Sequence, residues 1–501
     1  MLVVEKYTEQ EQTRRESLKK IQDLGINPYP AEEYKTNATS QEIKEGFKKK
    51  SVCLAGRIMS RRIMGKASFI ELKDFKGKIQ VYINRDEICP KEDKTMYNDV
   101  FKKYLDIGDI IGVEGDIFTT KVGEISVRAK KIKILSKSIK PLPVVKTDTE
   151  GKIYDDFKNT ELRYRQRSID LIVNENSWDV FEKRTEIYNH IRTLLNKEGY
   201  MEVETPILQS VAGGAAAKPF ITHHNSLDIP LYLRIANELY LKRLIVGGKE
   251  GVYEFAKDFR NEGMDKTHNP EFTMLELYVA YKDYHWMMKF IENVFEKTVK
   301  SVCGKTVIKY GNTEINFKGP YKKISFFESI KKETGDDISK MTEQELFKYC
   351  KSKKIETKKS MGRGKLFDAV FGFFCEKKLI QPTYITNYPI EMSPLTKKHR
   401  TEEGLTERFE LFINGKEIAN AYSEQNNPIE QRESFKEQMK LANKGDDEAM
   451  LIDNDFLKAL EYGMPPTSGI GIGMDRLTMI LTNKKSIQDV LFFPQMKPEN
   501  K

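Results

Sequence analysis

Five short stretches between residues 51 and 135 alternate apolar and polar side chains, and this periodicity constrains the fold more than any other feature of the chain. The alternation is clearest where Ile79, Val81 and Ile83 flank polar or aromatic neighbours. Polar turns such as Glu114-Gly115-Asp116 separate the stretches. A period of two places successive side chains on opposite faces of a β-strand. We therefore expect a small antiparallel barrel of five strands.

Two polar or aromatic positions in this segment favour nucleic-acid binding. Five-stranded oligonucleotide-binding (OB) barrels bind nucleic acid over strands 2 and 3. With the apolar residues inward, Phe69 and Gln80 point outward, and Arg57 and Arg61 lie on the preceding stretch. An outward ring and an outward amide suit stacking on a base and hydrogen bonding to its edge. The alternative is that each is an ordinary surface residue.

The segments on either side of the barrel differ in character. Residues 7–24 predict a helix that ends at Gly25. The basic side chains of this helix either contact phosphates or form a solvated face: Arg14, Arg15, Lys19 and Lys20. Residues 136–150 contain Pro141-Leu142-Pro143 and predict a linker.

From about residue 160 onward, helical and strand patterns mix to the end of the chain. Residues 177–198 predict a long helix, Met201 to Thr205 a strand, and residues 339–380 a helical insertion. We expect an α+β, multidomain protein with a helical extension over 1–50, the barrel over 51–145 and a larger domain over 146–501.

Composition excludes several classes of protein. No apolar run reaches the roughly 18 residues of a membrane span, and the N-terminus lacks the pattern of a secretory signal. The five cysteines are widely spaced, so neither a zinc site nor a disulfide framework is expected. We expect a cytoplasmic protein that does not bind a membrane. The net charge of +9 permits a polyanionic partner without proving one.

A strand-loop-strand pattern runs from Val252 to Tyr278 and places Arg260 at the end of the first strand, beside a polar loop over 263–267. A guanidinium at such a point can bind a phosphate through two hydrogen bonds. A salt-bridged hairpin without a ligand is the alternative interpretation.

A glycine-rich strand follows near the C-terminus, where Gly469, Gly471 and Gly473 alternate before Arg476. Glycines in a strand allow a ligand or another chain to approach the backbone closely. A dinucleotide-binding unit is excluded because the spacing differs and only 28 residues follow Gly473. Arg476 is expected to open a helix, where its guanidinium can stack on a base.

Between these two motifs, Glu410 and Glu417 flank an Asn414-Gly415 turn that predicts a hairpin. Opposed carboxylates on a hairpin repel each other unless a cation joins them, and carboxylates with ATP phosphates commonly bind magnesium. Two solvated strand glutamates are the alternative.

Taken together and in this order, these patterns resemble the three motifs of class II aminoacyl-tRNA synthetases. Motif 1 is similar to the long helix and the strand ending at Glu204-Thr205-Pro206, motif 2 to Phe259–Glu262 with its loop and return strand, and motif 3 to Gly469–Arg476. The resemblance covers residues 10 to 498. It implies an antiparallel catalytic sheet flanked by helices, an OB-fold anticodon-binding domain, and a homodimer formed through motif 1.

Denser runs are similar to the lysine branch of this family, class IIb and bacterial in type. They comprise Arg163–Arg167, Gly213–Phe220, Tyr232–Ala236, Glu238–Leu244 and His268–Tyr278. The chain departs from the branch at Asn237, where proline is frequent, at Ala421, where glycine is usual, and at Tyr422, where phenylalanine is frequent. These changes affect the shape of the pocket and remove no charged group.

The resemblance implies roles for individual residues. They form a lysine site, an ATP site and an anticodon site. The lysine site would comprise Gly214, Glu238, Arg260, Glu276, Tyr278, Asn420, Tyr422 and Glu424. The ATP site would comprise Arg260, Glu262, His268, Asn269, Phe272, Glu410, Glu417 and Arg476, with Glu410 and Glu417 holding two or three Mg²⁺ ions. Arg260, Glu262 and Arg476 would be catalytic, with adenine between Phe272 and Arg476. Arg61, Phe69, Gln80 and Glu124 would read the anticodon of tRNA(Lys).

Physical reasoning about charge agrees with lysine as the substrate. Aspartyl and asparaginyl enzymes share the architecture but bind an anionic or neutral side chain. Three glutamates around one pocket would repel aspartate and suit an ammonium, whose desolvation must be offset by opposite charge. We expect a two-step reaction through lysyl-adenylate that needs no side-chain nucleophile.

Two other functions compete with this hypothesis. A paralog that transfers lysine to a protein would lack the barrel, and a non-enzymatic RNA-binding protein would have lost Arg260, Glu262, Glu410, Glu417 and Arg476. The sequence contains both the barrel pattern and these residues. His223 and His224 are expected to serve packing against a partner or loop hydrogen bonding instead of catalysis.

Overall fold

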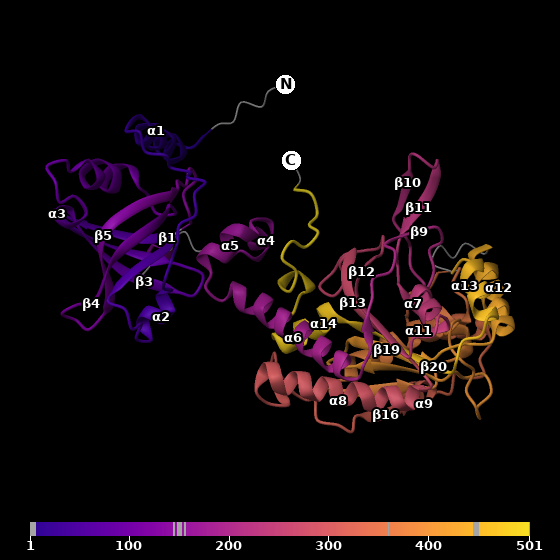
Figure 1. Cartoon of the computed structure of the whole chain (residues 1–501). Coiled ribbons are helices and arrows are strands. Elements are labelled where there is room, and N and C mark those ends of the chain that lie inside the picture. Colours follow the sequence, from indigo (N-terminus) through magenta and orange to yellow (C-terminus); the bar gives the residue numbers. More distant parts are fainter. Residues whose placement is uncertain are drawn as a thin grey trace. The chain divides into compact units, whose positions relative to one another are not determined.

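The computed structural model of the chain describes residues 7–143, 146–147, 153–154, 157–358, 360–443 and 450–499. It divides into two compact units, shown in Figure 1. The first comprises Met1–Arg163 and Ser168–Asn174, and the second comprises Tyr164–Arg167 and Glu175–Lys501. The linker predicted over residues 136–150 lies partly outside the described residues.

The first unit contains a closed barrel of five strands in the order β1-β2-β3-β5-β4. The strands are β1 (Ser51–Met64), β2 (Ala67–Lys73), β3 (Lys78–Asn84), β4 (Ile110–Thr119) and β5 (Ile125–Ser136). The predicted five-stranded barrel is confirmed, with the difference that β3 and β5 pair in parallel. Burial alternates along β2 and β3, so that Phe69 and Gln80 face outward as expected.

A helix at the start of the chain packs on this barrel. Helix α1 (Glu9–Asp23) begins at a capping box formed by Thr8 and Glu11, and Gly25 follows it at φ +73°. Its Arg14 is buried and donates hydrogen bonds to the carbonyls of Ile107 (2.9 Å), Ser138 (3.2 Å) and Lys140 (3.2 Å). Arg14 therefore anchors the helix and fits neither the phosphate contact nor the solvated face proposed for it.

The remaining elements of the first part of the chain are short. They are α2 (Ser40–Lys44), α3 (Arg85–Ile88), a π-helix (Met96–Tyr104), β6 (Lys146–Thr147), β7 (Ile153–Tyr154), α4 (Thr160–Arg165) and α5 (Arg167–Val173).

An eight-stranded sheet in the order β16-β17-β18-β19-β20-β13-β12-β8 forms the centre of the second unit. Its strands are β8 (Met201–Glu202), β12 (Gly251–Phe259), β13 (Glu271–Ala280), β16 (Lys322–Ser325), β17 (Thr383–Thr386), β18 (Arg408–Phe412), β19 (Glu417–Ser423) and β20 (Thr467–Gly473). All neighbouring pairs are antiparallel except β16–β17 and β12–β8 at the two edges. The expected helix-flanked antiparallel sheet is confirmed.

The strand predicted from Met201 to Thr205 is shorter than expected, because β8 ends at Glu202. The hydroxyl of Thr205 donates to Oε2 of Glu254 at 2.7 Å, and Pro206 has no N–H to donate to a sheet. The chain therefore leaves the sheet early.

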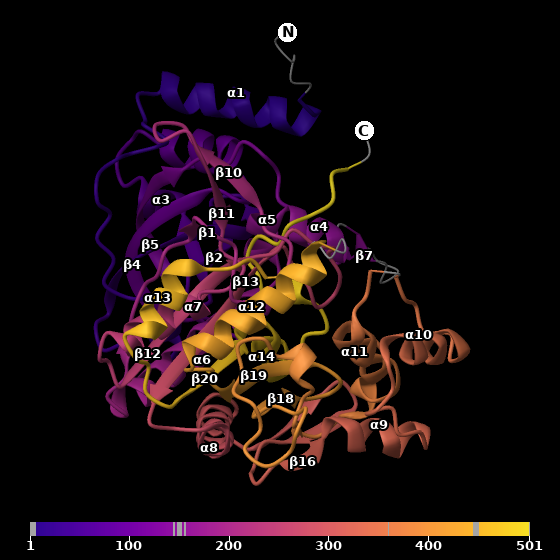
Figure 2. The same cartoon turned by 90° about the vertical axis from the view of Figure 1, so that its right-hand side faces the viewer.

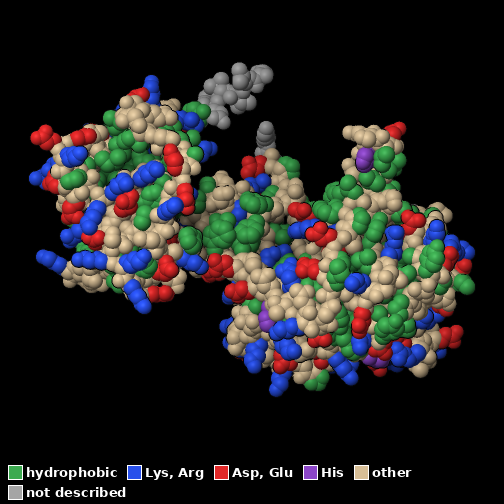
Figure 3. Space-filling view, viewed as in Figure 1, with side chains coloured by type: hydrophobic (Ala, Val, Ile, Leu, Met, Phe, Trp, Pro, Cys, Tyr) green, Lys and Arg blue, Asp and Glu red, His purple; other side chains and the backbone are tan. Residues whose placement is uncertain are grey.

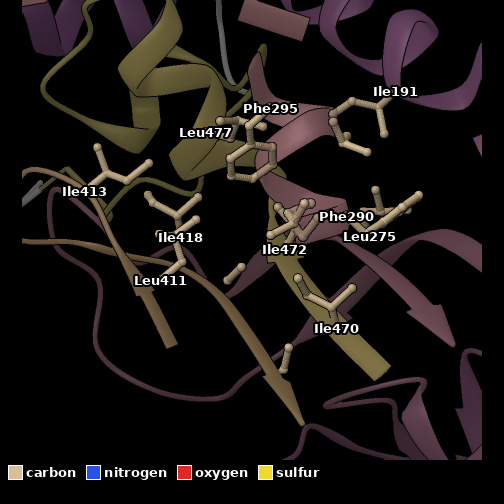
Figure 4. Close-up of a cluster of buried hydrophobic side chains, with 14 of the residues drawn as sticks. Ile191, Leu275, Phe290, Phe295, Leu411, Ile413, Ile418, Ile470, Ile472 and Leu477 are labelled. Carbon is tan, nitrogen blue, oxygen red and sulfur yellow. The ribbon is translucent and has the colours of Figure 1, made fainter. Parts of the chain in front are cut away.

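One face of the sheet packs on three helices and forms the largest core. They are α6 (Ser177–Lys197), α8 (Tyr284–Cys303) and α14 (Met474–Leu481). Figure 4 shows Leu275, Ile470 and Ile472 of the central strands meeting Phe295 of α8 and Leu477 of α14. Alternate residues of each strand are committed to this core, so the residues between them face the opposite side.

The opposite side carries helices α7 (Glu238–Val246), α12 (Pro428–Asn443) and α13 (Asn454–Glu461), which share an apolar cluster around Phe435, Phe456 and Leu457. Two helices fall within the region predicted to be helical: α10 (Glu343–Ser352) and α11 (Arg363–Phe374). With α9 (Phe326–Thr334) they form one group in Figure 2 and share a phenylalanine-rich core.

Two small sheets complete the second unit. One contains β9 (Leu208–Gln209), β10 (Ile221–His224) and β11 (Ile229–Leu233), and the other contains β14 (Val307–Tyr310) and β15 (Thr313–Asn316). Among the described residues, no helix combines the length and the apolar character needed to cross a membrane.

Candidate functional site

Two rows of side chains cross the open face of the large sheet at right angles to the strands. Residues that pair across neighbouring strands share a face of the sheet. The first row consists of Glu276, Gly471, Asn420 and Glu410, in β13, β20, β19 and β18. The second row lies two residues away along each of the same strands. It consists of Tyr278, Gly469, Tyr422 and Arg408. Residues from both motifs and from the Glu410–Glu417 hairpin therefore meet on one surface.

The glycines of these rows make room for side chains of the same chain. A Cβ atom on Gly471 would lie 2.4 Å from Oε1 of Glu276, and one on Gly469 would lie 2.1 Å from Oε1 of Glu424. Any other residue at either position would force these carboxylates to move. The predicted close approach to the glycine backbone is present, but the approaching groups are carboxylates of this protein.

A cavity of about 1340 Å³ lies over this face. It is lined by all the predicted lysine and ATP residues except one: Gly214, Glu238, Arg260, Glu262, His268, Asn269, Phe272, Glu276, Tyr278, Glu410, Glu417, Asn420, Tyr422 and Arg476. The exception is Glu424, whose side chain is completely buried behind the lining.

Three glutamates gather at one part of this site. Tyr278 donates a hydrogen bond to Oε2 of Glu276 (2.9 Å), and Tyr422 donates one to Oε1 of Glu238 (2.6 Å). Burial, together with the nearby carboxylates of Glu238 and Asp258, raises the pKa of Glu276 to about 8. Burial also raises the pKa of Glu424, against the opposing charge of Lys242.

Lys242 is a functional candidate that the sequence reasoning missed. Its ammonium group is fully buried and forms ion pairs with Glu238, four residues earlier in α7, and with Glu424. The sequence offered one signal, a glutamate and a lysine at i and i+4 of a helix. That spacing ordinarily indicates a weak surface pair, whereas here both partners are buried.

Arg260 lies at the other part of the cavity, at the end of β12. Its guanidinium carbon is 5.0 Å from the centre of the Phe272 ring, and its buried Nε has no hydrogen-bond partner. Its backbone N–H donates to the carbonyl of Pro270 (2.8 Å), which fixes the base of the loop. Asp258 lies nearby, and burial raises its pKa to about 6 although Arg234 and Arg260 oppose the shift.

The third motif places Arg476 in the first turn of α14, as predicted. Its Nη1 donates to the backbone carbonyl of Glu417 (2.9 Å) and to Oε2 of that residue (3.2 Å), and its Nη2 lies 3.1 Å from Nε2 of His268. The guanidinium thus joins the β18–β19 hairpin to the motif 2 loop.

Glu410 and Glu417 are not directly opposed, which corrects the expected geometry. Glu410 pairs with Asn420, while Glu417 pairs with Phe412 across a β-bulge. Nη2 of Arg408 binds Oε1 of Glu410 at 2.6 Å. Burial raises the pKa of Glu410 to about 7, Arg408 opposes this shift, and the charges of Glu417 and Asp368 add to it.

The excess of carboxylates at this point fits a cation. Arg408 neutralises one charge, while Glu410, Glu417 and Asp368 lie near one another. Within the described parts of the chain, no three acidic, histidine or cysteine side chains are arranged to hold a metal by themselves. A magnesium ion here would therefore need phosphate oxygens as well, the usual arrangement for this ion.

On the barrel, the predicted anticodon residues differ in what they contact. Nε2 of Gln80 donates to Oε2 of Glu124 (2.9 Å), and the hydroxyl of Ser126 donates to Oε1 of Gln80 (3.1 Å). The guanidinium of Arg61 instead donates to the carbonyls of Phe101 (3.0 Å), Lys102 (3.3 Å) and Leu105, at the end of the π-helix.

Phe69 belongs to a row of rings that the sequence reasoning did not identify. Its ring centre is 5.2 Å from that of Tyr82, which is 6.1 Å from that of Phe118. The guanidinium carbon of Arg128 lies 5.7 Å from the Tyr82 ring centre and 5.0 Å from that of Phe118. Tyr82 sits between inward Val81 and Ile83, so the strand parity could have found it.

His223 and His224 lie on the exposed strand β10, away from this cavity's lining. Nε2 of His223 is 3.1 Å from Oδ1 of Asp228, and Nδ1 of His224 accepts a hydrogen bond from the N–H of Leu227 (3.3 Å). These contacts are local hydrogen bonds of a hairpin, one of the two roles expected for them.

Comparison with known families places the two parts of the chain separately. Residues 159–497 match the family of class II tRNA synthetases (D, K and N). Residues 52–135 match the OB-fold nucleic acid binding domain.

Individual relatives are similar over almost the whole chain. A lysine–tRNA ligase of Porphyromonas gingivalis is 62% identical over 498 residues, which cover 98% of this chain and 86% of that protein. A lysine–tRNA ligase of Christiangramia forsetii is 62% identical over 499 residues, 99% of this chain and 88% of the relative. One of Azobacteroides pseudotrichonymphae is 58% identical over 496 residues, 98% and 99% of the two chains.

Proposed function

The chain belongs to the class II tRNA synthetases (D, K and N), and we propose that its cavity carries out the reaction of its lysine–tRNA ligase relatives. The protein is a lysine–tRNA ligase that uses ATP to attach lysine to tRNA. One observation carries the assignment of the site: Glu238, Glu276 and buried Glu424 gather beside the same cavity that holds Arg260 and Arg476.

The carboxyl groups select an ammonium over other side chains. A lysine ammonium leaving water must recover its hydration energy from opposite charge and hydrogen bonds. The acidic part of the cavity, with the Tyr278 and Tyr422 hydroxyls already bound to Glu276 and Glu238, supplies both. Aspartate would meet like charge, and asparagine would leave these carboxyl groups without a cation. The Gly214 backbone and Asn420 complete the lysine pocket.

Arg260 binds the reacting groups at the other part of the cavity. Its unpartnered Nε and its planar guanidinium suit two hydrogen bonds to anionic oxygens. We assign it to the carboxylate of lysine and the α-phosphate of ATP. A carboxylate oxygen of lysine then attacks the α-phosphorus, the bond to the pyrophosphate oxygen breaks, and lysyl-adenylate forms. Arg260 acts by positioning and by neutralising charge.

The second step transfers lysine to tRNA. A ribose hydroxyl at the 3′ end of tRNA attacks the carbonyl carbon of the adenylate. AMP leaves with the electrons of the mixed anhydride bond, and the hydroxyl proton passes to the departing phosphate or to solvent. ATP is bound by Glu262, His268, Asn269, Phe272 and Arg476, with adenine between Phe272 and Arg476. No side chain of the cavity forms a covalent intermediate in this scheme.

Glu410 and Glu417 are the residues that would hold Mg²⁺, two or three ions in total with ATP. Bound Mg²⁺ supplies neutralisation of the charge on the phosphates. Burial and the charges of Glu417 and Asp368 raise the pKa of Glu410 despite the opposing Arg408, so a cation at this point would favour its charged form.

The barrel reads the anticodon of tRNA(Lys) in this proposal. Phe69 contributes a partly exposed ring, and Gln80 and Glu124 contribute hydrogen-bonding groups that already contact each other. Arg61 is committed to the backbone carbonyls of the π-helix, so its role in reading is to hold that edge of the barrel in place. An enzyme of protein synthesis of this kind acts in the cytoplasm.

We also propose a homodimer formed through motif 1. Several large apolar side chains around β8 to β11 are exposed although they could be buried by a partner: Met201, Ile207, Leu208, Ile221, Leu227 and Ile229. Apolar side chains also gather on the projecting β10–β11 hairpin in Figure 3. A second copy of the chain would cover them.

Lysine charging of purified tRNAs tests the function. The protein should attach labelled lysine to tRNA(Lys) in the presence of ATP and Mg²⁺, and leave tRNAs for aspartate and asparagine uncharged. Lysine-dependent exchange of pyrophosphate into ATP should occur without tRNA. Folded protein that binds tRNA(Lys) but is silent in the exchange would instead be a non-enzymatic RNA-binding protein.

A further inference from the structure

Lys242 connects a glutamate of the amino-acid pocket to a glutamate in the interior of the protein. Lys242 has no exposed side-chain area, and its ammonium bridges Glu238, which lines the cavity, and Glu424, which lies behind it. The Glu424 carboxylate is also buried, and its Oε1 has no hydrogen-bond partner. That oxygen lies directly over the backbone of Gly469, beside the Tyr278 ring.

No other cation among the described residues binds these two carboxylates. From α7, Glu238 and Lys242 face each other; from β13, Glu276 and Tyr278 face them; from β19, Tyr422 donates its hydroxyl to Glu238. The Tyr422 ring centre lies 5.4 Å from the Lys242 nitrogen, and the Phe456 ring of α13 lies at 5.8 Å.

The charges of this group fit one bound ammonium. Glu238 and Glu424 bring two negative charges and Lys242 brings one positive charge. Glu276, with its pKa raised to about 8, holds its proton near neutral pH, so the group retains one negative charge. A substrate ammonium would bring that total to zero. Without Lys242, two buried carboxylates would face a single ammonium, and an unbalanced buried charge is strongly unfavourable.

We propose that Lys242 is an internal counter-ion that sets the charge of the lysine pocket, so that Glu238 and Glu424 together attract one ammonium group and no more. Lys242 is thus a positioning residue that acts on the substrate through the two glutamates. This inference rests on the proposed function, because it takes a lysine side chain as the pocket's ligand.

A double-variant cycle distinguishes this role from simple packing. Glu424→Gln removes one negative charge and leaves Lys242 to neutralise Glu238, so the KM for lysine should rise at least about tenfold. Adding Lys242→Met frees Glu238 for the substrate. The double variant K242M/E424Q should therefore have a lysine KM at least about threefold lower than E424Q alone. The KM for ATP should stay within about twofold across the set.

Lys242→Arg tests whether the positive charge at this position matters more than the shape of the side chain. It keeps the positive charge in a different form and should retain a lysine KM much closer to the wild type than E424Q does. The single variant K242M leaves two buried carboxylates unbalanced, so the cycle uses E424Q and the double variant and does not depend on K242M folding by itself.

A matched control exists in the barrel. Lys137 is equally buried and binds Asp109 (3.1 Å) and Asp106 (2.6 Å) there. D109N and K137M/D109N should lower the melting temperature without changing the lysine KM in pyrophosphate exchange.

Three results would contradict the proposal in different ways. A double variant that does not fold although E424Q folds, or one whose lysine KM equals or exceeds that of E424Q, overturns the counter-ion role and makes Lys242 structural. A control pair that changes the lysine KM to the same extent overturns it as well. If the wild-type protein shows no lysine-dependent exchange, the proposed function itself is wrong. That failure is visible without any variant and is therefore distinct from failure of the counter-ion role.

Discussion

The amino-acid pocket and the outer face of the barrel handle polar groups in opposite ways. In the pocket, Glu238, Lys242 and Glu424 are buried and each depends on another for its charge balance. On the barrel, Phe69 and Gln80 lie on the surface, where water can replace a lost contact. A substitution in the pocket should therefore disturb binding, pH dependence and stability together, whereas one on the barrel should disturb only the RNA contact.

The largest expected effect separates the two regions most sharply. Arg260→Ala should lower the rate of lysine-dependent pyrophosphate exchange by about 10²- to 10³-fold, the usual cost of losing one group that stabilises transition-state charge. Binding of tRNA(Lys), measured by filter retention, should be unchanged. Loss of tRNA binding to the same degree would mean that Arg260 supports the fold and not the reaction.

Removing one pocket carboxylate comes next. Glu238→Gln should raise the KM for lysine about tenfold or more, the equivalent of one charge pair, while the KM for ATP changes far less. Steady-state exchange kinetics with each substrate varied in turn measure both constants. Equal increases for lysine and ATP would contradict the placement of Glu238 beside the ammonium.

The barrel offers the opposite signature. Phe69→Ala should weaken tRNA(Lys) charging by roughly 1–3 kcal/mol, the value of one base stacked on an aromatic ring, and leave pyrophosphate exchange intact. Phe75 is a matched control, because it is 82% exposed on the same barrel and, within the described part of the chain, stacks on no other aromatic ring. If Phe69→Ala reduced both activities alike, the ring would be structural.

A pH effect on stability should distinguish the two regions by a measurement that does not depend on activity. The pKa of Glu276 is about 8 in the folded protein against an ordinary value of 4.5, so the folded state holds a proton that the unfolded chain releases. Between these values, stability should fall as pH rises, by roughly 1.4 kcal/mol per pH unit for one group. Glu276→Gln should flatten the melting temperature from pH 5 to pH 8.

The barrel variant Phe69→Ala serves as the comparison for that measurement, since it alters no titrating group. Its melting temperature should follow the same pH slope as the wild-type protein. A Glu276→Gln slope identical to the wild type would show that Glu276 ionises normally in the pocket.

The sequence predicted the barrel well because its strands expose one face and bury the other. The apolar residues at Ile79, Val81 and Ile83 indicate which side chains of the strand face the core. This pattern correctly predicted that Phe69 and Gln80 face outward. The same parity also placed Tyr82 outward, although its role in the row of rings required the neighbouring strand to be known.

The sequence predicted residues that line one cavity but not the geometry in which they meet. Glu276, Gly471 and Asn420 lie in strands far apart in the sequence, and only the register of the sheet brings them into one row. The two-residue Asn414-Gly415 turn pairs Glu417 with Phe412, and the bulge at Leu411 and Phe412 shifts the partner of Glu410 to Asn420. The turn residues already separate the two glutamates, whereas the bulge and the register between distant strands have no local pattern.

Buried charges were the other failure of sequence reasoning. Lys242 looks like a solvated helix residue four positions after Glu238, and Arg14 looks like part of a basic surface. Both are buried by segments more than a hundred residues away, through Glu424 for Lys242 and through Ser138 for Arg14. Charge placement of this kind follows from tertiary packing and leaves no periodic signal.

The amino-acid dependence of pyrophosphate exchange by the wild-type protein tests the central claim most directly. With ATP, Mg²⁺ and no tRNA, lysine should support exchange, while aspartate, asparagine and the uncharged analogue norleucine should not. Exchange supported by aspartate or norleucine as well as by lysine would contradict a pocket that selects its substrate by a positive charge.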